Sequence, residues 1–239
     1  MHRRTAPRLA RILACAAVPV MLVATGCSSD DSGGKKKESA KPTQSAKPTS
    51  TASVKPAAYG KLPEVCKTLS EKTVDKLVPK AEKKEGKALP STDTNDSASC
   101  FWSGLNDEDV KDLQFRSLTV SLKRFPSDPT LGSGEKRAQD FAAQQTTKAA
   151  TQDGAKDAKT EKAGDVGDDA SVVSTQTKKD DNDFTNETVV ARSQNVVVSV
   201  KYSGAGYEGA KSPNADDMKK DAQEAAKEVV AAVANANKQ

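Results

Sequence analysis

Histidine is almost absent from this sequence of 239 residues, in which His2 is the single example. Nucleophilic catalysis by serine or cysteine usually depends on a histidine base, and zinc sites usually include histidine ligands. The composition therefore argues against Ser-His, Cys-His and histidine-ligated zinc chemistry. A lysine or carboxylate base is left open, but the sequence on balance predicts a protein that is not an enzyme and that holds no cofactor and no metal.

The chain also lacks the short glycine motifs that bind phosphate or expose a nucleophile. Residues 132–134 and residues 203–206 are two segments that combine serine with more than one glycine. Neither segment forms the five-residue nucleophile elbow, and neither ends in the Gly-Lys-Ser or Gly-Lys-Thr of a phosphate-binding loop. We interpret both segments as turns.

The apolar stretch of residues 12–23 is too short to span a bilayer. Four arginines flank or precede it and small residues follow at 24–26, so residues 1–26 have the three zones of an export signal peptide. A soluble secreted protein would share these zones. Cys27, directly after the small residues, instead favours a lipoprotein whose Cys27 thiol is diacylated and becomes the first residue after cleavage. This predicts attachment to the membrane through a lipid anchor at Cys27, on the extracytoplasmic face of the cell membrane.

Cysteine is scarce outside this region. Of the four cysteines, Cys15 belongs to the signal and Cys27 to the anchor, which leaves Cys66 and Cys100. An even pair in an oxidising compartment indicates one disulfide. The alternative, a metal-binding pair of thiols, lacks further ligands.

Most of the chain also lacks a large net charge of either sign. The formal net charge of +4 is accounted for by the arginines of residues 1–26, and from Lys61 onward 27 basic residues face 30 acidic residues. Binding to a phosphate backbone needs a basic face. The sequence therefore predicts no nucleic-acid partner.

A polar, low-complexity segment follows the predicted anchor. Residues 28–60 are rich in Ser, Lys, Pro, Thr and Ala, and Ser-Ala-Lys-Pro-Thr occurs twice, at 39–43 and at 45–49. Such a composition cannot bury enough apolar surface to fold. We therefore expect residues 27–60 to form a lipid-anchored disordered linker and residues 61–239 to form an extracytoplasmic domain. Contact of the linker lysines with anionic lipid, and glycosylation of its hydroxyls, are left open.

Three segments of the expected domain have helical spacing. A short helix is expected after the capping residue Ser70 and is ended by Pro79. Residues 134–149 carry a modest apolar stripe, and a long amphipathic helix is expected after the capping residue Asn214.

Other segments have the alternation of strands. Residues 115–125 alternate most clearly, and further strand-like runs are found at 99–102, 170–176, 187–192 and 196–202. The last two runs are joined by a tight hairpin at 193–195, whereas residues 150–163 are expected to form a loop. This order predicts an α+β domain, in which an antiparallel β-sheet is flanked by an N-terminal helix and a long C-terminal helix.

Several of these features occur together in a family that the sequence resembles. They are the lipobox ending at Cys27, the tether, Cys66, the run Cys100-Phe101-Trp102, the segment 164–170, the hairpin with Asn195, and the C-terminal helix. In this combination the chain looks like an uncharacterised family of actinobacterial exported lipoproteins, a domain of unknown function, over residues 61–235. The resemblance implies a PsbP-like fold and an envelope location. It implies no catalytic residue, because none is known for the family.

Two acidic clusters, residues 107–109 and 180–183, could supply oxygen ligands for calcium. Their spacing does not match the helix-loop-helix calcium pattern, because Asn186 stands where the sixth-position glycine would be if Asp181 came first. We interpret both clusters as solvated loop acids.

Trp102 and Tyr207 are the two candidates for a ligand-binding residue, because large amphipathic side chains anchor interfaces when they are exposed. Trp102 stands beside Cys100, so that packing in the core is the stronger interpretation. Tyr207 lies in the glycine-rich run 203–209, which is expected to be a mobile loop at the rim of a ligand or partner site.

Two hypotheses of function follow from these features. The first is a surface-tethered binding or accessory module that recognises an envelope protein, a glycan or a lipid. The second is a histidine-free envelope enzyme acting on glycan or lipid, which would need two carboxylates facing each other across a cleft. The absence of catalytic motifs favours the first.

Overall fold

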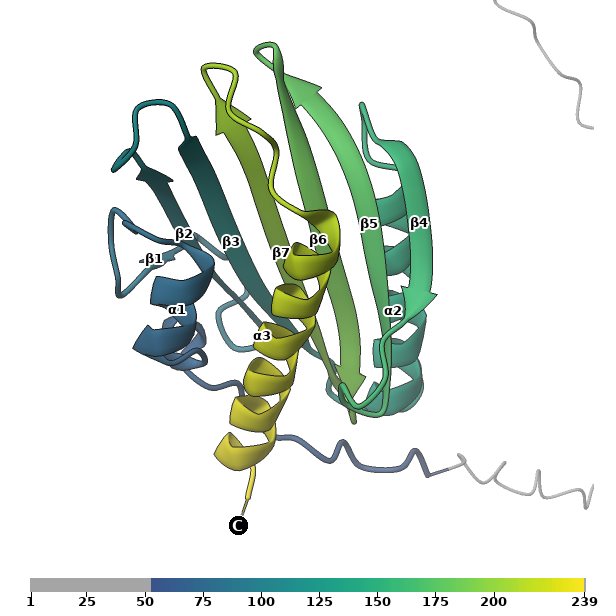
Figure 1. The fold of residues 1–239 in the computed structure, drawn as a ribbon. Helices are drawn as coiled ribbons and strands as arrows, with labels where there is room; N and C mark the ends of the chain where they lie inside the picture. Colours follow the sequence, from purple (N-terminus) through teal and green to yellow (C-terminus); the bar gives the residue numbers. More distant parts are fainter. Residues whose placement is uncertain (1–52, 239) are drawn as a thin grey trace, which may run out of the picture. The chain divides into compact units, whose positions relative to one another are not determined.

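The computed structural model describes residues 53–238, which form one antiparallel sheet and three α-helices (Figure 1). The elements in chain order are the short 3-10 helix η1 (Val65–Lys67), α1 (Glu71–Leu77), β1 (Lys87–Ala88), β2 (Ser97–Asn106), β3 (Leu113–Arg124), α2 (Gly134–Ala150), β4 (Lys156–Lys162), β5 (Asp169–Lys179), β6 (Asn182–Ser193), β7 (Val196–Tyr207) and α3 (Ala215–Ala236). The prediction of an α+β domain with an antiparallel sheet and a long C-terminal helix is confirmed.

The seven strands are arranged in the order β1-β2-β3-β7-β6-β5-β4, and every neighbouring pair is antiparallel. The C-terminal strand β7 therefore lies in the middle, between β3 and β6. This position explains its sequence, because a strand with neighbours on both sides and helices over its faces is buried at most positions.

The main core lies between the sheet and α3, which crosses one face together with α1 (Figure 1). Val198 and Val200 of β7 are fully buried there, as are Ala222 and Val229 of α3. The small alanines on this side of α3 let the helix approach the valine-rich strands closely. At the start of α3, the Asn214 side chain accepts a hydrogen bond from the Asp217 N–H at 3.0 Å, so the predicted cap is confirmed.

The other face of the sheet carries α2 (Figure 1). A smaller cluster joins Ala138 of this helix to Val190 and Val197, with Phe125 and Phe141 packed beside it. Because the cluster is small, α2 stabilises this face less than α3 stabilises the opposite one.

The expectation of a loop over residues 150–163 is wrong, because residues 156–162 form strand β4 at the edge of the sheet. All seven residues of β4 are exposed, and its sequence consists largely of charged and polar residues. No apolar alternation marks such a strand. It forms because β5 offers an unpaired edge, and its lysines are typical of edge strands, which must avoid pairing with other chains.

The predicted disulfide between Cys66 and Cys100 is confirmed, with a Cα–Cα distance of 5.2 Å. Cys100 lies in β2 and is fully buried, whereas Cys66 belongs to η1, just before α1. The bond therefore fixes the first helical segment of the domain to the sheet.

Asn195, in the turn between β6 and β7, is completely buried and joins three separate parts of the chain. Its Oδ1 accepts a hydrogen bond from the Tyr59 N–H at 2.7 Å, and its Nδ2 donates to the carbonyls of Tyr59 and Phe125, both at 3.0 Å. Directly after Tyr59, the Gly60 N–H donates a hydrogen bond to Asn237 Oδ1 at 2.9 Å.

Tyr59 and Gly60, which precede the expected boundary at Lys61, are thus held against the domain by these contacts. The signal peptide predicted for residues 1–26, the lipidation site Cys27 and most of the predicted linker lie outside the described residues.

Segment 164–170 packs against the same hairpin. Gly167 has a φ of +65°, and a Cβ added there would lie 2.4 Å from the Arg192 carbonyl oxygen. The next residue, Asp168, accepts hydrogen bonds from the Gln194 N–H at 2.6 Å and from Arg192 Nη1 at 2.9 Å. The glycine and the aspartate thus hold the end of β6 and the turn that follows it.

No helix within residues 53–238 combines the length and the apolar character needed to cross a membrane.

Candidate functional site

Trp102 lies in β2 on the face covered by α1 and is 1% exposed. Its indole Nε1 donates a hydrogen bond to the Lys84 carbonyl at 3.1 Å, so its polar group has a partner within the protein. The interpretation of Trp102 as a core residue is confirmed.

The turn at Gly86 closes over this indole. Gly86 has a φ of +75°, and a Cβ added there would lie 2.5 Å from both Cys100 Sγ and Trp102 Cε2. Only glycine allows the backbone to approach the disulfide and the ring so closely. The loop between α1 and β1 is therefore fixed in place over Trp102.

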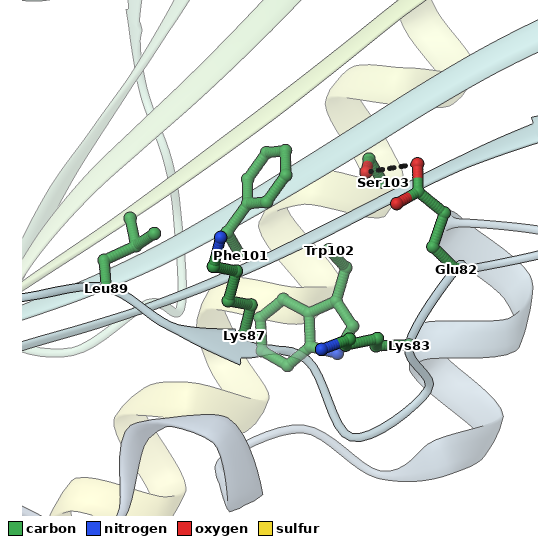
Figure 2. Close-up of a pocket in the computed structure, with 7 residues that line it drawn as sticks. All are labelled: Glu82, Lys83, Lys87, Leu89, Phe101, Trp102 and Ser103. Carbon is green, nitrogen blue, oxygen red and sulfur yellow. Dashed lines mark hydrogen bonds between the residues drawn. The ribbon is translucent and has the colours of Figure 1, made fainter.

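A pocket of about 510 Å³ opens beside this covered tryptophan (Figure 2). Its lining comes from the loop after α1, from β1 and the residue that follows it, and from β2, and comprises Glu82, Lys83, Lys87, Leu89, Phe101, Trp102 and Ser103. The volume is in the range of pockets for small molecules. We call it the β2 edge pocket.

Apolar side chains form a large part of the β2 edge pocket. Leu89 is 37% exposed, and Phe101 is half-buried on the opposite side of β2 from Trp102. An exposed leucine beside an aromatic ring offers a surface for an apolar ligand group. Sequence reasoning identified Trp102 but not Phe101, although the alternation of strand residues places Phe101 on the more accessible face.

The lining of the β2 edge pocket contains two lysines and one glutamate, and these residues differ in their contacts. Lys83 and Lys87 are both exposed, and neither forms an ion pair with any residue in the described part of the chain. Glu82 is the one carboxylate of the lining, and its Oε1 accepts a hydrogen bond from Ser103 Oγ at 3.3 Å (Figure 2). The rim of the pocket is thus positively charged.

The expectation that Tyr207 lies in a mobile loop is wrong. Tyr207 is the last residue of β7, and the glycines before it belong to that strand. Its ring stacks on Phe115, with a centroid distance of 5.7 Å and an interplanar angle of 5°, and packs edge-on against Phe184. Burial raises the pKa of Tyr207 above its usual value. The long pairing of β7 with β3 and β6 overrides the turn preference of the glycines.

The structure does not bring Trp102 and Tyr207 together. Trp102 faces α1, whereas the register of β7 places Tyr207 on the opposite face of the sheet, with Ala205 and Ser203. The two sequence candidates therefore do not belong to one site.

The acidic clusters lie at hairpin turns, residues 107–109 between β2 and β3 and residues 180–181 between β5 and β6. Glu108 pairs with Lys80 at 2.8 Å, and this contact lowers the pKa of Glu108. Within residues 53–238, no three His, Cys, Asp or Glu side chains are placed to hold a metal ion together.

Glu187 of β6 is a buried carboxyl group that sequence reasoning missed, because it stands in an alternating strand like a solvent-facing residue. It is 1% exposed, and burial raises its pKa from the usual 4.5 to about 7, against the opposing effect of a hydrogen bond from Ser174. Ser174 Oγ lies 2.6 Å from Glu187 Oε2.

We expect Glu187 to make stability depend on pH. Because its pKa is raised in the folded state, folding takes up a proton between about pH 4.5 and 7, and stability falls as the pH rises through this interval. Above pH 7 the ionised side chain should cost about 3 kcal/mol. Urea unfolding of wild type and Glu187→Gln at a series of pH values measures this. The variant should be the more stable at pH 8 and equal at pH 4, and equal curves at both would contradict the assignment.

Comparisons of this chain with models of protein families, with curated proteins and with solved structures gave no match.

Proposed function

We propose that this protein is a lipid-anchored extracytoplasmic lipoprotein that acts as a binding or accessory module of the cell envelope, and that the β2 edge pocket holds its ligand. The anchor rests on the sequence of residues 1–27, and the binding role rests on the pocket. We further propose that it belongs with the actinobacterial exported lipoproteins of PsbP-like fold. The antiparallel sheet with its long C-terminal helix supports that assignment.

The observation that carries the binding role is the combination of apolar and basic side chains in the β2 edge pocket. Phe101 and Leu89 offer an apolar surface, and at its rim lie the ammonium groups of Lys83 and Lys87, neither of which has an ion-pair partner within residues 53–238. This arrangement is complementary to a small amphiphile with an apolar chain and an anionic head. A membrane-anchored domain would meet such molecules among lipids and their precursors.

The same lining favours binding over hydrolysis. Hydrolysis of a glycosidic bond by carboxylates needs two of them on either side of the substrate. The β2 edge pocket has one, Glu82, and its Oε1 is engaged by Ser103.

Dodecyl phosphate tests the proposed ligand class, with dodecyltrimethylammonium as a probe of equal chain length and opposite charge. Trp102 is the sole tryptophan, so its fluorescence reports on this pocket alone. We expect dodecyl phosphate to bind with a dissociation constant on the order of 10 μM below its micelle concentration, and the cationic probe to bind at least tenfold more weakly. The variant Phe101→Ser and the double variant Lys83→Glu/Lys87→Glu should each weaken binding about tenfold.

The control variants make comparable changes elsewhere on the surface: Leu131→Ser replaces an exposed apolar residue by serine, and Lys111→Glu reverses the charge of an exposed lysine. Both should bind as wild type does. If the two probes bind equally, or if the control variants lose as much affinity as the pocket variants, this pocket is not the binding site.

The anchor is tested separately by Cys27→Ala. We expect this change to abolish incorporation of labelled palmitate, because the thiol that accepts the lipid is missing. Labelling and membrane fractionation of cells that express either form measure this, with Cys15→Ala as the matched control. Labelling that persisted in Cys27→Ala would refute the anchor without affecting the proposal for the pocket.

A further inference from the structure

A second pocket, of about 290 Å³, lies on the α3 side of the sheet, between β4, β5, β6 and the start of α3. Glu187 and Ser174 belong to its lining and pair across the two strands, as do Thr185 and Gln176. These four polar side chains therefore form one block under the first turn of α3. We call it the Glu187 pocket.

Glu187 is the buried group of this pocket. Its Oε2 accepts the hydrogen bond of Ser174, but its Oε1 has no hydrogen-bond partner among the described residues. Glu187 also forms no ion pair with any of them. A carboxyl group that is 1% exposed with one free oxygen is costly to keep in a fold unless a ligand uses it.

The charges around Glu187 determine which ligand could use it. Acids outnumber bases in the lining, with Asp157, Glu161, Asp216 and Glu187 against Lys159 and Lys219. The first turn of α3 is already occupied by acids, and its Asp217 N–H is capped by Asn214. An anionic ligand would therefore meet a surplus of carboxylates. A metal ion is also disfavoured, because no group of three ligands is placed for it within residues 53–238.

We propose that the Glu187 pocket binds the primary ammonium group of a small polar ligand, such as a diamine or an amino sugar, through a charge-assisted hydrogen bond to the Glu187 carboxylate. An ammonium group has three donors and no acceptor, which suits a site rich in oxygen acceptors. Thr185 and Gln176, which also line the pocket, carry further oxygen acceptors. This site is separate from the β2 edge pocket and does not depend on the function proposed for it.

Lys219 of α3 is the protein's own ammonium group in the Glu187 pocket. It pairs with Glu161 Oε2 at 3.2 Å and with Asp216 Oδ1 at 3.5 Å, and both acids are largely exposed. Ion pairs with exposed carboxylates are weak, so the lysine can move aside when a ligand enters. Lys219 is thus a competitor for the ligand, and its removal should tighten binding.

Binding should depend on pH because Glu187 must be ionised. The charged groups that face it are Asp157, Lys159 and Glu161 from β4, and Asp216 and Lys219 from α3. Burial raises the pKa of Glu187 to about 7, so the carboxyl group is neutral at pH 5 and charged at pH 8. The ammonium groups of a diamine, like that of lysine, stay charged at both pH values, whereas the less basic ammonium group of an amino sugar loses part of its charge by pH 8. Affinity for a diamine should therefore rise between these two pH values.

Titration of the full chain by calorimetry tests the proposal with putrescine and glucosamine, each compared with its hydroxyl analogue, 1,4-butanediol or glucose. At pH 8 we expect at least one amine to bind in the millimolar range, about tenfold more tightly than its analogue, and we expect putrescine, if it binds, to bind about tenfold more tightly than at pH 5. Binding of putrescine alone indicates a free amine as the ligand, and binding of glucosamine alone indicates an amino sugar.

Variants distinguish binding at Glu187 from a nonspecific effect of the protein's charge. Glu187→Gln keeps the shape of the side chain and should bind the amine at least tenfold more weakly, whereas Lys219→Ala should bind it several-fold more tightly. Glu82→Gln, in the β2 edge pocket, should bind as wild type does. Urea unfolding of each variant verifies that it is folded. The proposal is overturned if neither amine binds, if the neutral analogues bind equally well, or if Glu187→Gln retains full affinity.

Discussion

Removal of the disulfide by the double change Cys66→Ala/Cys100→Ala is expected to lower the free energy of unfolding by about 3 to 4 kcal/mol. The bond closes a loop with a sequence separation of 34 residues, and restricting a loop of this length in the unfolded chain accounts for most of the effect. Urea unfolding of the variant and of the oxidised wild type measures the difference.

Reduced wild type is the control for this change, because it loses the bond but keeps both sulfur atoms. Cys100 is fully buried, in contact with the turn at Gly86, so the alanine variant should be somewhat less stable than the reduced protein. A difference under 1 kcal/mol between oxidised and reduced wild type would contradict the role assigned to the bond. Because the disulfide also positions β2, its loss should weaken ligand binding at the β2 edge pocket.

The change Asn195→Asp is expected to destabilise the protein by about 3 to 5 kcal/mol at neutral pH. Asn195 donates two hydrogen bonds to carbonyl groups, and an aspartate would place a buried negative charge against those oxygens. The Tyr59 N–H would still find an acceptor, so the loss is confined to the two donated bonds and the charge. Urea unfolding again measures the effect, which should diminish at acidic pH as the aspartate becomes protonated.

Asn237→Asp is the matched control for this variant. The Asn237 amide makes the same kind of contacts, accepting from the Gly60 N–H and donating to the carbonyls of Lys61 and Val233. It is partly open to solvent, where water replaces lost hydrogen bonds, so the change should cost about 1 kcal/mol or less. Equal effects of the two variants would show that burial does not make the hydrogen bonds of Asn195 more important for stability than those of Asn237.

The predictable parts of the fold are those in which local pattern and tertiary context agree. Residues 115–125 alternate in sequence and form β3, the helix expected over 134–149 is α2, and Asn214 caps α3 as expected. In each case the apolar positions are the ones that the sheet or helix buries.

The incorrect predictions concern segments in which the local sequence pattern and the tertiary context disagree. β4 has no apolar side of its own and exists because β5 needs a partner, and the glycines before Tyr207 extend β7 because β3 and β6 pair with them. Local preferences favour turns or loops at both places. Pairing with a neighbouring strand decides the outcome, and the identity of that neighbour cannot be deduced from the segment itself.

The candidate sites were the least predictable part. Trp102 was identified by its residue type, but the accessible residues of the β2 edge pocket are Phe101, Leu89 and two lysines, which come from three segments of the chain. Glu187 differs from the exposed acids around it only by its position under α3. The residues of each set come from separate strands and loops, so no regular spacing in the sequence signals either site.

The sequence by itself determined the class of the domain, its single disulfide and most of its helices and strands, because apolar period, capping residues and a lone pair of cysteines are local properties. It also provides the whole basis for the predicted lipid anchor at Cys27. The tertiary structure alone decided the strand order, the edge position of β4, the burial of Asn195 and Glu187, and the two pockets. These depend on which distant segments meet, and burial rather than residue type then decides whether a polar side chain is a solvated acid or a candidate ligand-binding group.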